Sequence, residues 1–150
     1  MKLIWGSDNV EHPSSRKIEE VLMSTRHTVS QIASYGSTTS WVDIGRSVGL
    51  AVADGTADRG VVSCWTGTGV AIAANRLPGV RAAVCDNVKV AEQSRLYNHA
   101  NVLALSLERL DPSEIERIIL AWLKAPNGAE QRNNVNDLEH WVQDRHSNEE

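Results

Sequence analysis

The stretch Val61-Val62-Ser63-Cys64-Trp65-Thr66-Gly67-Thr68-Gly69-Val70-Ala71-Ile72-Ala73-Ala74-Asn75 decides how this chain folds. It begins with an apolar, β-branched run that ends on Cys64, continues through a loop with two glycines and closes in an alanine-rich segment. This pattern predicts a buried strand, a tight turn and the first turns of a helix. The first backbone N–H groups of a helix have no partner within it, so an anion or oxyanion can bind there. Cys64 would stand at the carboxyl end of the strand, where open α/β sheets bind their ligands.

Strands and helices are predicted to alternate on both sides of this stretch. Five segments have the apolar, β-branched character of buried strands: 2–7, 28–32, 59–64, 80–85 and 100–105. Helices are predicted between and after them, starting at Pro13, over 42–53, 68–76 and 87–97, from a capping box at 111–114, and over about 128–145. The alternation indicates one doubly wound α/β domain over 1–150, with helices on both faces of a parallel sheet.

The last predicted helix differs from the others because it is polar and has a sparse apolar stripe. That stripe consists of Val135, Leu138, Trp141 and Val142. So few apolar residues are more typical of a face that docks on a partner subunit than of a helix packed in a core.

The composition excludes several classes of protein. The chain has 150 residues, 41% of them hydrophobic and 23% charged, as expected for one globular domain. Its net charge of -4 and the absence of any basic run argue against a nucleic-acid surface. No apolar segment approaches the length of a membrane span, and residues 1–5 lead into a strand rather than a signal peptide. We therefore expect a cytoplasmic protein that binds neither nucleic acid nor membrane.

Two cysteines, Cys64 and Cys85, are too few for a disulfide framework. Both end apolar strand candidates, so either could be a small buried hydrophobic residue. We expect this for Cys85, since no glycine loop follows it. At Cys64 the loop favours reactivity, because a thiol near a helix N-terminus ionises more readily.

Six motifs along the chain follow the order and spacing of one family: Gly6-Ser7-Asp8, Ala57-Asp58-Arg59-Gly60, Cys64 with Thr66-Gly67-Thr68-Gly69, Ile72-Ala73-Ala74-Asn75, Gly79-Val80-Arg81-Ala82-Ala83, and Asn98 with Ala100-Asn101-Val102-Leu103-Ala104-Leu105. Over about residues 1–125 they resemble the ribose-5-phosphate isomerase B family, which also contains the galactose-6-phosphate isomerase subunits.

The resemblance implies a Rossmann-like three-layer αβα sandwich that forms a homodimer or a dimer of dimers, with each active site shared between two subunits. It also implies aldose–ketose isomerisation through an enediolate, without a metal or organic cofactor. In cysteine-type members, the residue matching Cys64 moves the proton and the glycine loop holds the enediolate oxygens. The residues agree with this chemistry, because removing a proton next to a carbonyl requires a base and a pocket for the resulting oxyanion.

The predicted site has two groups of residues. Cys64 and Thr66 are the predicted catalytic residues, and the predicted substrate-binding residues are Asp8, Asn9, Gly67, Thr68, Gly69, Tyr97, Asn98, His99 and Arg132. Asp8 would bind a substrate hydroxyl, with helix capping or loop bracing as the alternative. Asn98 would hold another oxygen from the neighbouring subunit, with a loop hydrogen bond as the alternative. Arg81 and Asn75 are expected to brace the loop or interface, and Asp43 to cap a helix.

The chain departs from the family at the positions that recognise phosphate and open the sugar ring. Asn9 stands where the family has a histidine, and it cannot carry positive charge to a phosphate. Tyr97 stands at the ring-opening histidine, and a phenol is a poor base at neutral pH. His99 could substitute for that histidine, or be a surface histidine without a role. Trp65 replaces a glycine and adds bulk and an indole donor at the pocket mouth.

The family's C-terminal arginine positions hold Glu130 and Asn134, although Arg132 could reach in. A carboxylate repels phosphate and lacks the paired donors of arginine. We therefore expect an isomerase for a sugar or sugar phosphate, its specificity changed from ribose 5-phosphate and its substrate's phosphate altered or missing. Two alternatives remain open: the cysteine-bearing subunit of a hetero-oligomeric isomerase, and a non-catalytic sugar-binding or regulatory protein on the same scaffold.

Overall fold

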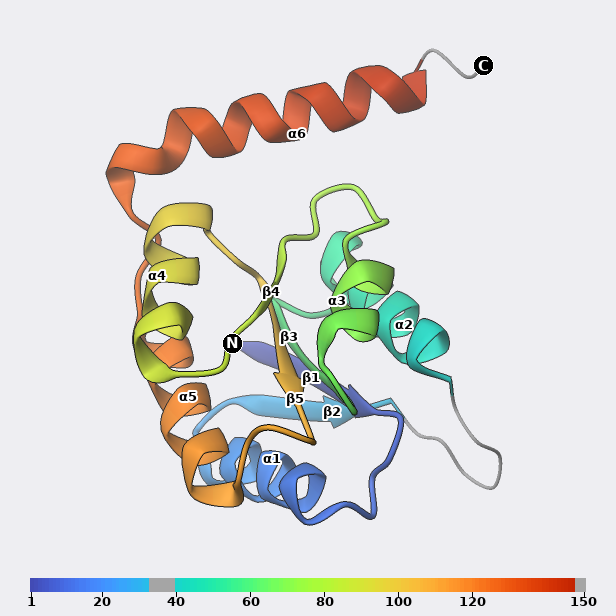
Figure 1. The fold of residues 1–150 in the computed structure, drawn as a ribbon. Coiled ribbons are helices and arrows are strands. Elements are labelled where there is room, and N and C mark those ends of the chain that lie inside the picture. The colour runs from blue at the N-terminus through green and yellow to red at the C-terminus, as the bar shows by residue number, and fades with distance from the viewer. Residues whose placement is uncertain (33–39, 148–150) are drawn as a thin grey trace.

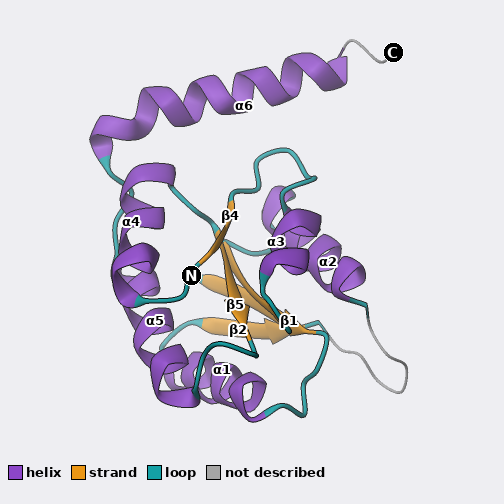
Figure 2. Ribbon diagram, viewed as in Figure 1, coloured by secondary structure: helices purple, strands orange, loops and turns teal. Residues whose placement is uncertain are grey.

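The computed structural model describes residues 1–32 and 40–147, and its centre is a parallel sheet (Figures 1 and 2). The strands run in the spatial order β2-β1-β3-β5-β4. Their bounds are β1 (Lys2–Ser7), β2 (Thr28–Gln31), β3 (Arg59–Cys64), β4 (Ala82–Val84) and β5 (Val102–Ser106). Central strands β3 and β5 are apolar and buried along most of their length, as expected for a sheet covered on both faces.

Helices cover the sheet in two layers (Figure 1). One layer holds α1 (Pro13–Ser24), α4 (Val88–Asn98) and α5 (Pro112–Lys124), and the other holds α2 (Trp41–Ala53) and α3 (Thr68–Ala74). A short 3-10 turn, η1 (Ala129–Gln131), leads into α6 (Arg132–Ser147), which lies across one end of the molecule and apart from both layers. The three-layer α/β fold expected from the sequence is confirmed.

Each face of the sheet has its own hydrophobic core. On the α1/α5 side, Ile18, Leu22, Ile118 and Ile119 pack with Trp122 and the facing strand residues. The core on the other side is built from smaller side chains, because α2 and α3 approach closely. Gly45 makes this approach possible, since an added Cβ would lie 2.6 Å from the Ala73 Cβ.

Local sequence signals set the helix ends as expected. Asp111 and Glu114 form the reciprocal capping box at the start of α5, and Asp54 closes α2 before Gly55 at φ 78°. The cap of α2 is Ser40 rather than Asp43: the Ser40 hydroxyl accepts the Asp43 N–H at 3.1 Å. Of the polar loop predicted at 36–40, residues 36–39 lie outside the described residues.

Strand β4 is shorter than the predicted 80–85. The Asn101 side chain accepts the N–H of Arg81 at 2.7 Å, and the Asn75 side chain accepts that of Ala82 at the same distance. These side chains take the N–H groups of Arg81 and Ala82, and regular pairing with β5 begins at Ala82.

None of the helices in the two described ranges is long and apolar enough to cross a bilayer.

Candidate active site

The sheet topology brings the β1–α1 and β3–α3 loops together at the carboxyl edge of the sheet. β1 and β3 are neighbours, with Ser7 opposite Ser63, and the chain leaves this pair in opposite directions across the sheet. Such a topological switch point is where open α/β sheets bind ligands. Asp8 follows β1 directly and Cys64 ends β3, so these two predicted site residues lie on adjacent strand ends.

The two cysteines occupy different surroundings. Cys64 is 4% exposed and stands immediately before the glycine loop. Cys85 is fully buried beside Ser94, and burial raises the pKa of its thiol to about 11. The expectation that Cys85 is a buried structural residue is confirmed.

Asp8 is the partly buried acid of the site, and its backbone joins the two loops. Its N–H donates to the carbonyl of Ser63 at 3.3 Å, one residue before Cys64. Burial raises the pKa of the Asp8 carboxyl, and a hydrogen bond from its own backbone partly offsets the rise. Asn9 is exposed, and its N–H donates to the Ser7 hydroxyl at 3.2 Å.

The glycine loop needs its glycines for two different reasons. Gly67 has φ 75°, and a Cβ there would lie 2.9 Å from the carbonyl carbon of Leu105. Gly69 is covered by the ring of Trp41, which a Cβ would approach to 2.9 Å. On either side of Gly67, the hydroxyls of Thr66 and Thr68 share a hydrogen bond of 2.7 Å.

His12 is a residue of this region that the sequence reasoning missed. Its Nδ1 accepts the Ser14 N–H at 3.1 Å and so caps α1. Its ring meets that of Trp65 edge-on, with centroids 6.2 Å apart, and Trp65 is 56% exposed. A histidine just before Pro13, at a predicted helix start, was the only signal in the sequence.

The remaining predicted site residues lie at the opposite edge of the sheet. Tyr97 and Asn98 end α4 just before β5 begins, whereas Cys64 stands where β3 finishes. Because the strands are parallel, the two groups are separated by the length of the sheet within one protomer. A single chain therefore does not bring Asn98 to Cys64.

His99 is not a surface histidine. It is 9% exposed, adopts φ 50° at the end of α4, and its Nε2 lies 2.7 Å from the carbonyl oxygen of Gly128. The Gly128 N–H in turn donates to Leu96 at 3.0 Å. These contacts fasten η1 to the end of α4, so the His99 ring already has a structural partner. Tyr97, in contrast, is 47% exposed.

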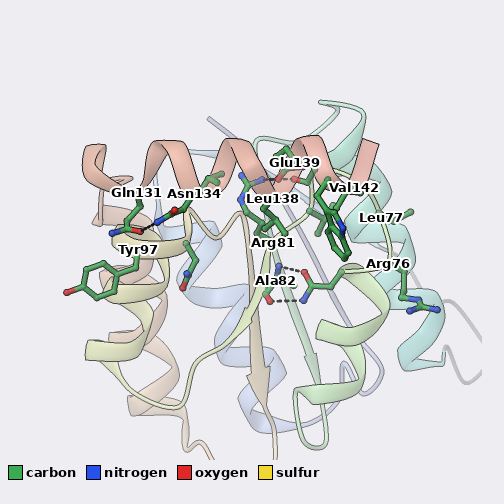
Figure 3. Close-up of a pocket in the computed structure, with 16 residues that line it drawn as sticks. Arg76, Leu77, Arg81, Ala82, Tyr97, Gln131, Asn134, Leu138, Glu139 and Val142 are labelled. Atoms are coloured by element: carbon green, nitrogen blue, oxygen red, sulfur yellow. Dashed lines mark hydrogen bonds and ion pairs between the residues drawn. The ribbon is translucent and has the colours of Figure 1, made fainter. Parts of the chain in front are cut away.

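A groove of about 530 Å3 lies beneath α6 (Figure 3). Its roof is the apolar stripe expected for docking: Val135, Leu138, Trp141 and Val142. Its floor includes Asn75, Leu77, Arg81, Ala82 and Asn98. Figure 3 shows the Tyr97 ring extending outward at the end of the groove, below Gln131.

Two contacts of the groove follow the expectation that Arg81 and Asn75 act as braces. Arg81 forms an ion pair with Glu139 of α6, and its Nε donates to the carbonyl of His99 at 3.1 Å. Asn75 bonds both backbone groups of Ala82, at 2.7 and 2.9 Å. Arg132 is exposed at the first residue of α6.

Among the described residues, no group of three or more His, Cys, Asp or Glu side chains is arranged to hold a metal ion.

Comparison with known proteins identifies the class of protein to which this chain belongs. A profile described as Ribose/Galactose Isomerase matches residues 3–138. Galactose-6-phosphate isomerase subunit LacB of Clostridium acetobutylicum is 36% identical over 126 residues, covering 83% of this chain and 73% of the relative. Ribose-5-phosphate isomerase B of Escherichia coli is 34% identical over 125 residues, covering 83% of this chain and 84% of the relative. The ribose-5-phosphate isomerase B structure from Clostridium thermocellum superposes with a TM-score of 0.89 at 35% identity, covering 97% of this chain and 99% of that one.

The fold, the cysteine loop and these relatives define an isomerase of the aldose–ketose class. The resemblance noted in the sequence is confirmed over nearly the whole chain. The chain belongs to the Ribose/Galactose Isomerase family.

Proposed function

We propose that this protein interconverts an aldose and a ketose through an enediolate, with Cys64 as the base. The proposal rests chiefly on the place of Cys64, at the end of β3, beside Asp8 and directly before the glycine loop. The Cys64 thiolate removes the proton from C2 of the open-chain aldose and becomes a thiol, while the electron pair moves onto the carbonyl oxygen. Return of the same proton to C1 gives the ketose and regenerates the thiolate.

The glycine loop and Thr66 act on the two substrate oxygens. Backbone N–H groups of the loop stabilise the charge that develops on O1. The proton on O2 moves to O1, and the Thr66 hydroxyl, which can both accept and donate, relays it. Asp8 binds a hydroxyl further along the sugar, which fixes the substrate relative to Cys64.

The complete site takes its second half from a neighbouring subunit. The apolar stripe of α6 lines a groove within its own chain, and the helix lies apart from the two helix layers (Figure 1). We propose a homodimer or a dimer of dimers in which this region docks on a second copy. Tyr97, Asn98 and Arg132 then contribute to the partner's Cys64 site.

The substrate differs from ribose 5-phosphate in its phosphate, which is altered or missing. At the switch point, exposed Asn9 replaces a cationic side chain, and Trp65 occupies the mouth beside His12. Tight, phosphate-dependent binding of ribose 5-phosphate in isothermal titration would contradict this part of the proposal.

Proton exchange in heavy water tests the reaction directly. The wild-type protein is incubated in D2O with aldoses, ketoses and their phosphates, and deuterium incorporation at the carbon next to the carbonyl is followed by NMR. We expect exchange with at least one sugar, and its loss in Cys64→Ala. Cys85→Ala is the matched control, because it removes the other buried free cysteine away from the loop. Equal exchange rates in Cys64→Ala and the wild type would exclude the cysteine base.

A second assembly is favoured by one observation. One relative, at 36% identity, is named as a subunit of galactose-6-phosphate isomerase. This chain would then be the cysteine-bearing subunit, and a partner chain would supply the cationic residues. In that case the purified chain alone shows no exchange with any sugar, and co-expression with a neighbouring paralogue restores it.

A further inference from the structure

The first backbone carbonyls of the loop after β3 accept hydrogen bonds from the end of β5 and the connection that follows it. The carbonyl of Cys64 accepts the Leu107 N–H at 3.0 Å. The carbonyl of Trp65 accepts both the Glu108 N–H at 3.0 Å and the Ser106 hydroxyl at 2.9 Å. All these donors lie on the β5 side of the loop.

The next carbonyl, that of Thr66, is held differently. It accepts a hydrogen bond of 3.1 Å from Nη2 of Arg109. The same guanidinium binds both carboxylate oxygens of Asp86, at 3.0 and 3.3 Å. Arg109 therefore ties the loop after β3 to the turn after β4.

These contacts determine where the loop amides point. In a planar trans peptide, the C=O of one residue and the N–H of the next point in opposite directions. A Thr66 carbonyl directed at Arg109 therefore turns the Gly67 N–H away from the β5 side. Asp8 lies on the other side of β3 from β5, at the end of β1.

We infer that Arg109 is a positioning residue of the isomerase, because it fixes the Thr66–Gly67 peptide plane so that the Gly67 N–H faces the substrate oxygen. The inference rests on the proposed function, in which loop amides hold that oxygen. Arg109 itself acts through the peptide and is not a catalytic residue.

Of these three peptide planes, the one after Thr66 alone depends on a side chain whose loss frees it. The planes after Cys64 and Trp65 are held by backbone N–H groups, which no substitution removes apart from proline. The plane after Thr66 is followed by Gly67, whose missing Cβ allows both signs of φ. Without Arg109, the peptide can turn over and direct a carbonyl oxygen, instead of an N–H, at the developing negative charge.

The variants Arg109→Gln and Arg109→Lys test the inference by steady-state kinetics on whichever sugar the wild type exchanges. Loss of one oxyanion donor lowers kcat by about 100- to 1000-fold in other enzymes. Because the peptide keeps part of its population in the right orientation, we expect about a 10- to 100-fold loss in kcat for Arg109→Gln, with KM changed less than about threefold. Arg109→Lys keeps one hydrogen-bond donor, so its kcat should lie between those of the wild type and Arg109→Gln. Added guanidinium should partly restore the kcat of Arg109→Gln.

The matched control is Arg46→Gln. Arg46 and Asp43 also form an exposed arginine–aspartate pair, with side chains 61% and 52% exposed, but both residues belong to α2 rather than to the loop. Loss of either exposed ion pair should change stability little. Arg46→Gln should therefore keep the wild-type kcat, and thermal unfolding of both variants should stay close to that of the wild type.

Two results separate this inference from the proposed function. If the wild type exchanges a sugar and Arg109→Gln retains its kcat, the inference is wrong and the proposed function stands. If the wild type exchanges no sugar, either alone or co-expressed with a paralogue, the proposed function fails, and a crystal structure of Arg109→Gln decides the inference. A Thr66 carbonyl that keeps its direction in that structure overturns the positioning role, and a flipped peptide supports it.

Discussion

Substitution of Gly67 by alanine separates backbone strain from a steric clash inside the active-site loop. The positive φ at Gly67 costs a non-glycine residue roughly 1–2 kcal/mol. The new Cβ would also lie 2.9 Å from the carbonyl carbon of Leu105, and such overpacking against fixed structure costs about 1–3 kcal/mol more. We therefore expect Gly67→Ala to lower the free energy of unfolding by about 2–5 kcal/mol.

Gly55→Ala is the matched control for this prediction. Gly55 has φ 78°, nearly the same as Gly67, and a Cβ there meets nothing within 4 Å. Gly55→Ala should therefore lower the free energy of unfolding by the backbone strain alone, about 1–2 kcal/mol. Urea denaturation of both variants at one protein concentration gives the difference between their free energies of unfolding, and the D2O exchange assay gives their activities. We expect exchange to be lost only in Gly67→Ala; equal stabilities and equal exchange rates in the two variants would refute the role assigned to the loop.

Two further predictions concern the mouth of the site. Burial raises the pKa of the Asp8 carboxyl, so ionised Asp8 opposes folding at neutral pH; Asp8→Asn should raise the melting temperature there while it lowers exchange. The gain in melting temperature should vanish in acid, once the carboxyl is protonated in both the folded and unfolded states, and a gain that persists in acid would point to another cause. Trp65→Gly removes the edge contact with His12 and opens the mouth, so we expect a higher kcat/KM for ribose 5-phosphate relative to unphosphorylated ribose. A ratio of kcat/KM values that stays at the wild-type value would show that Trp65 does not set specificity.

The sequence predicts the fold well because its signals are local and strong. The β-branched run before Cys64, the glycines that follow it and the capping box at Asp111 each specify one conformation, and all of them agree with the alternation of strands and helices. Strand β4 was overestimated because side chains of Asn75 and Asn101 take the N–H groups at its start, and such side-chain contacts leave no periodic pattern in the sequence.

The site was less predictable than the fold, because its contacts join distant segments. The pairing of His12 with Trp65 spans 53 residues and depends on a helix cap that has an unusual residue type. A surface histidine was one of the two interpretations of His99, yet its side chain is buried and bonds to Gly128, 29 residues later. The hold of Arg109 on the Thr66 carbonyl spans 43 residues and involves a backbone acceptor, which every residue possesses.

If active sites are shared between two subunits as proposed, the placement of Cys64 and Asn98 at opposite ends of the sheet has a genetic consequence. In a dimer with shared sites, a chain that lacks the cysteine still offers a sound second half to its neighbour. Two inactive variants, one changed at Cys64 and one at Asn98, would then regain one working site in every mixed dimer. Damage at one end of the sheet can thus be masked by a different allele in the same cell, whereas damage to the shared core of the fold cannot.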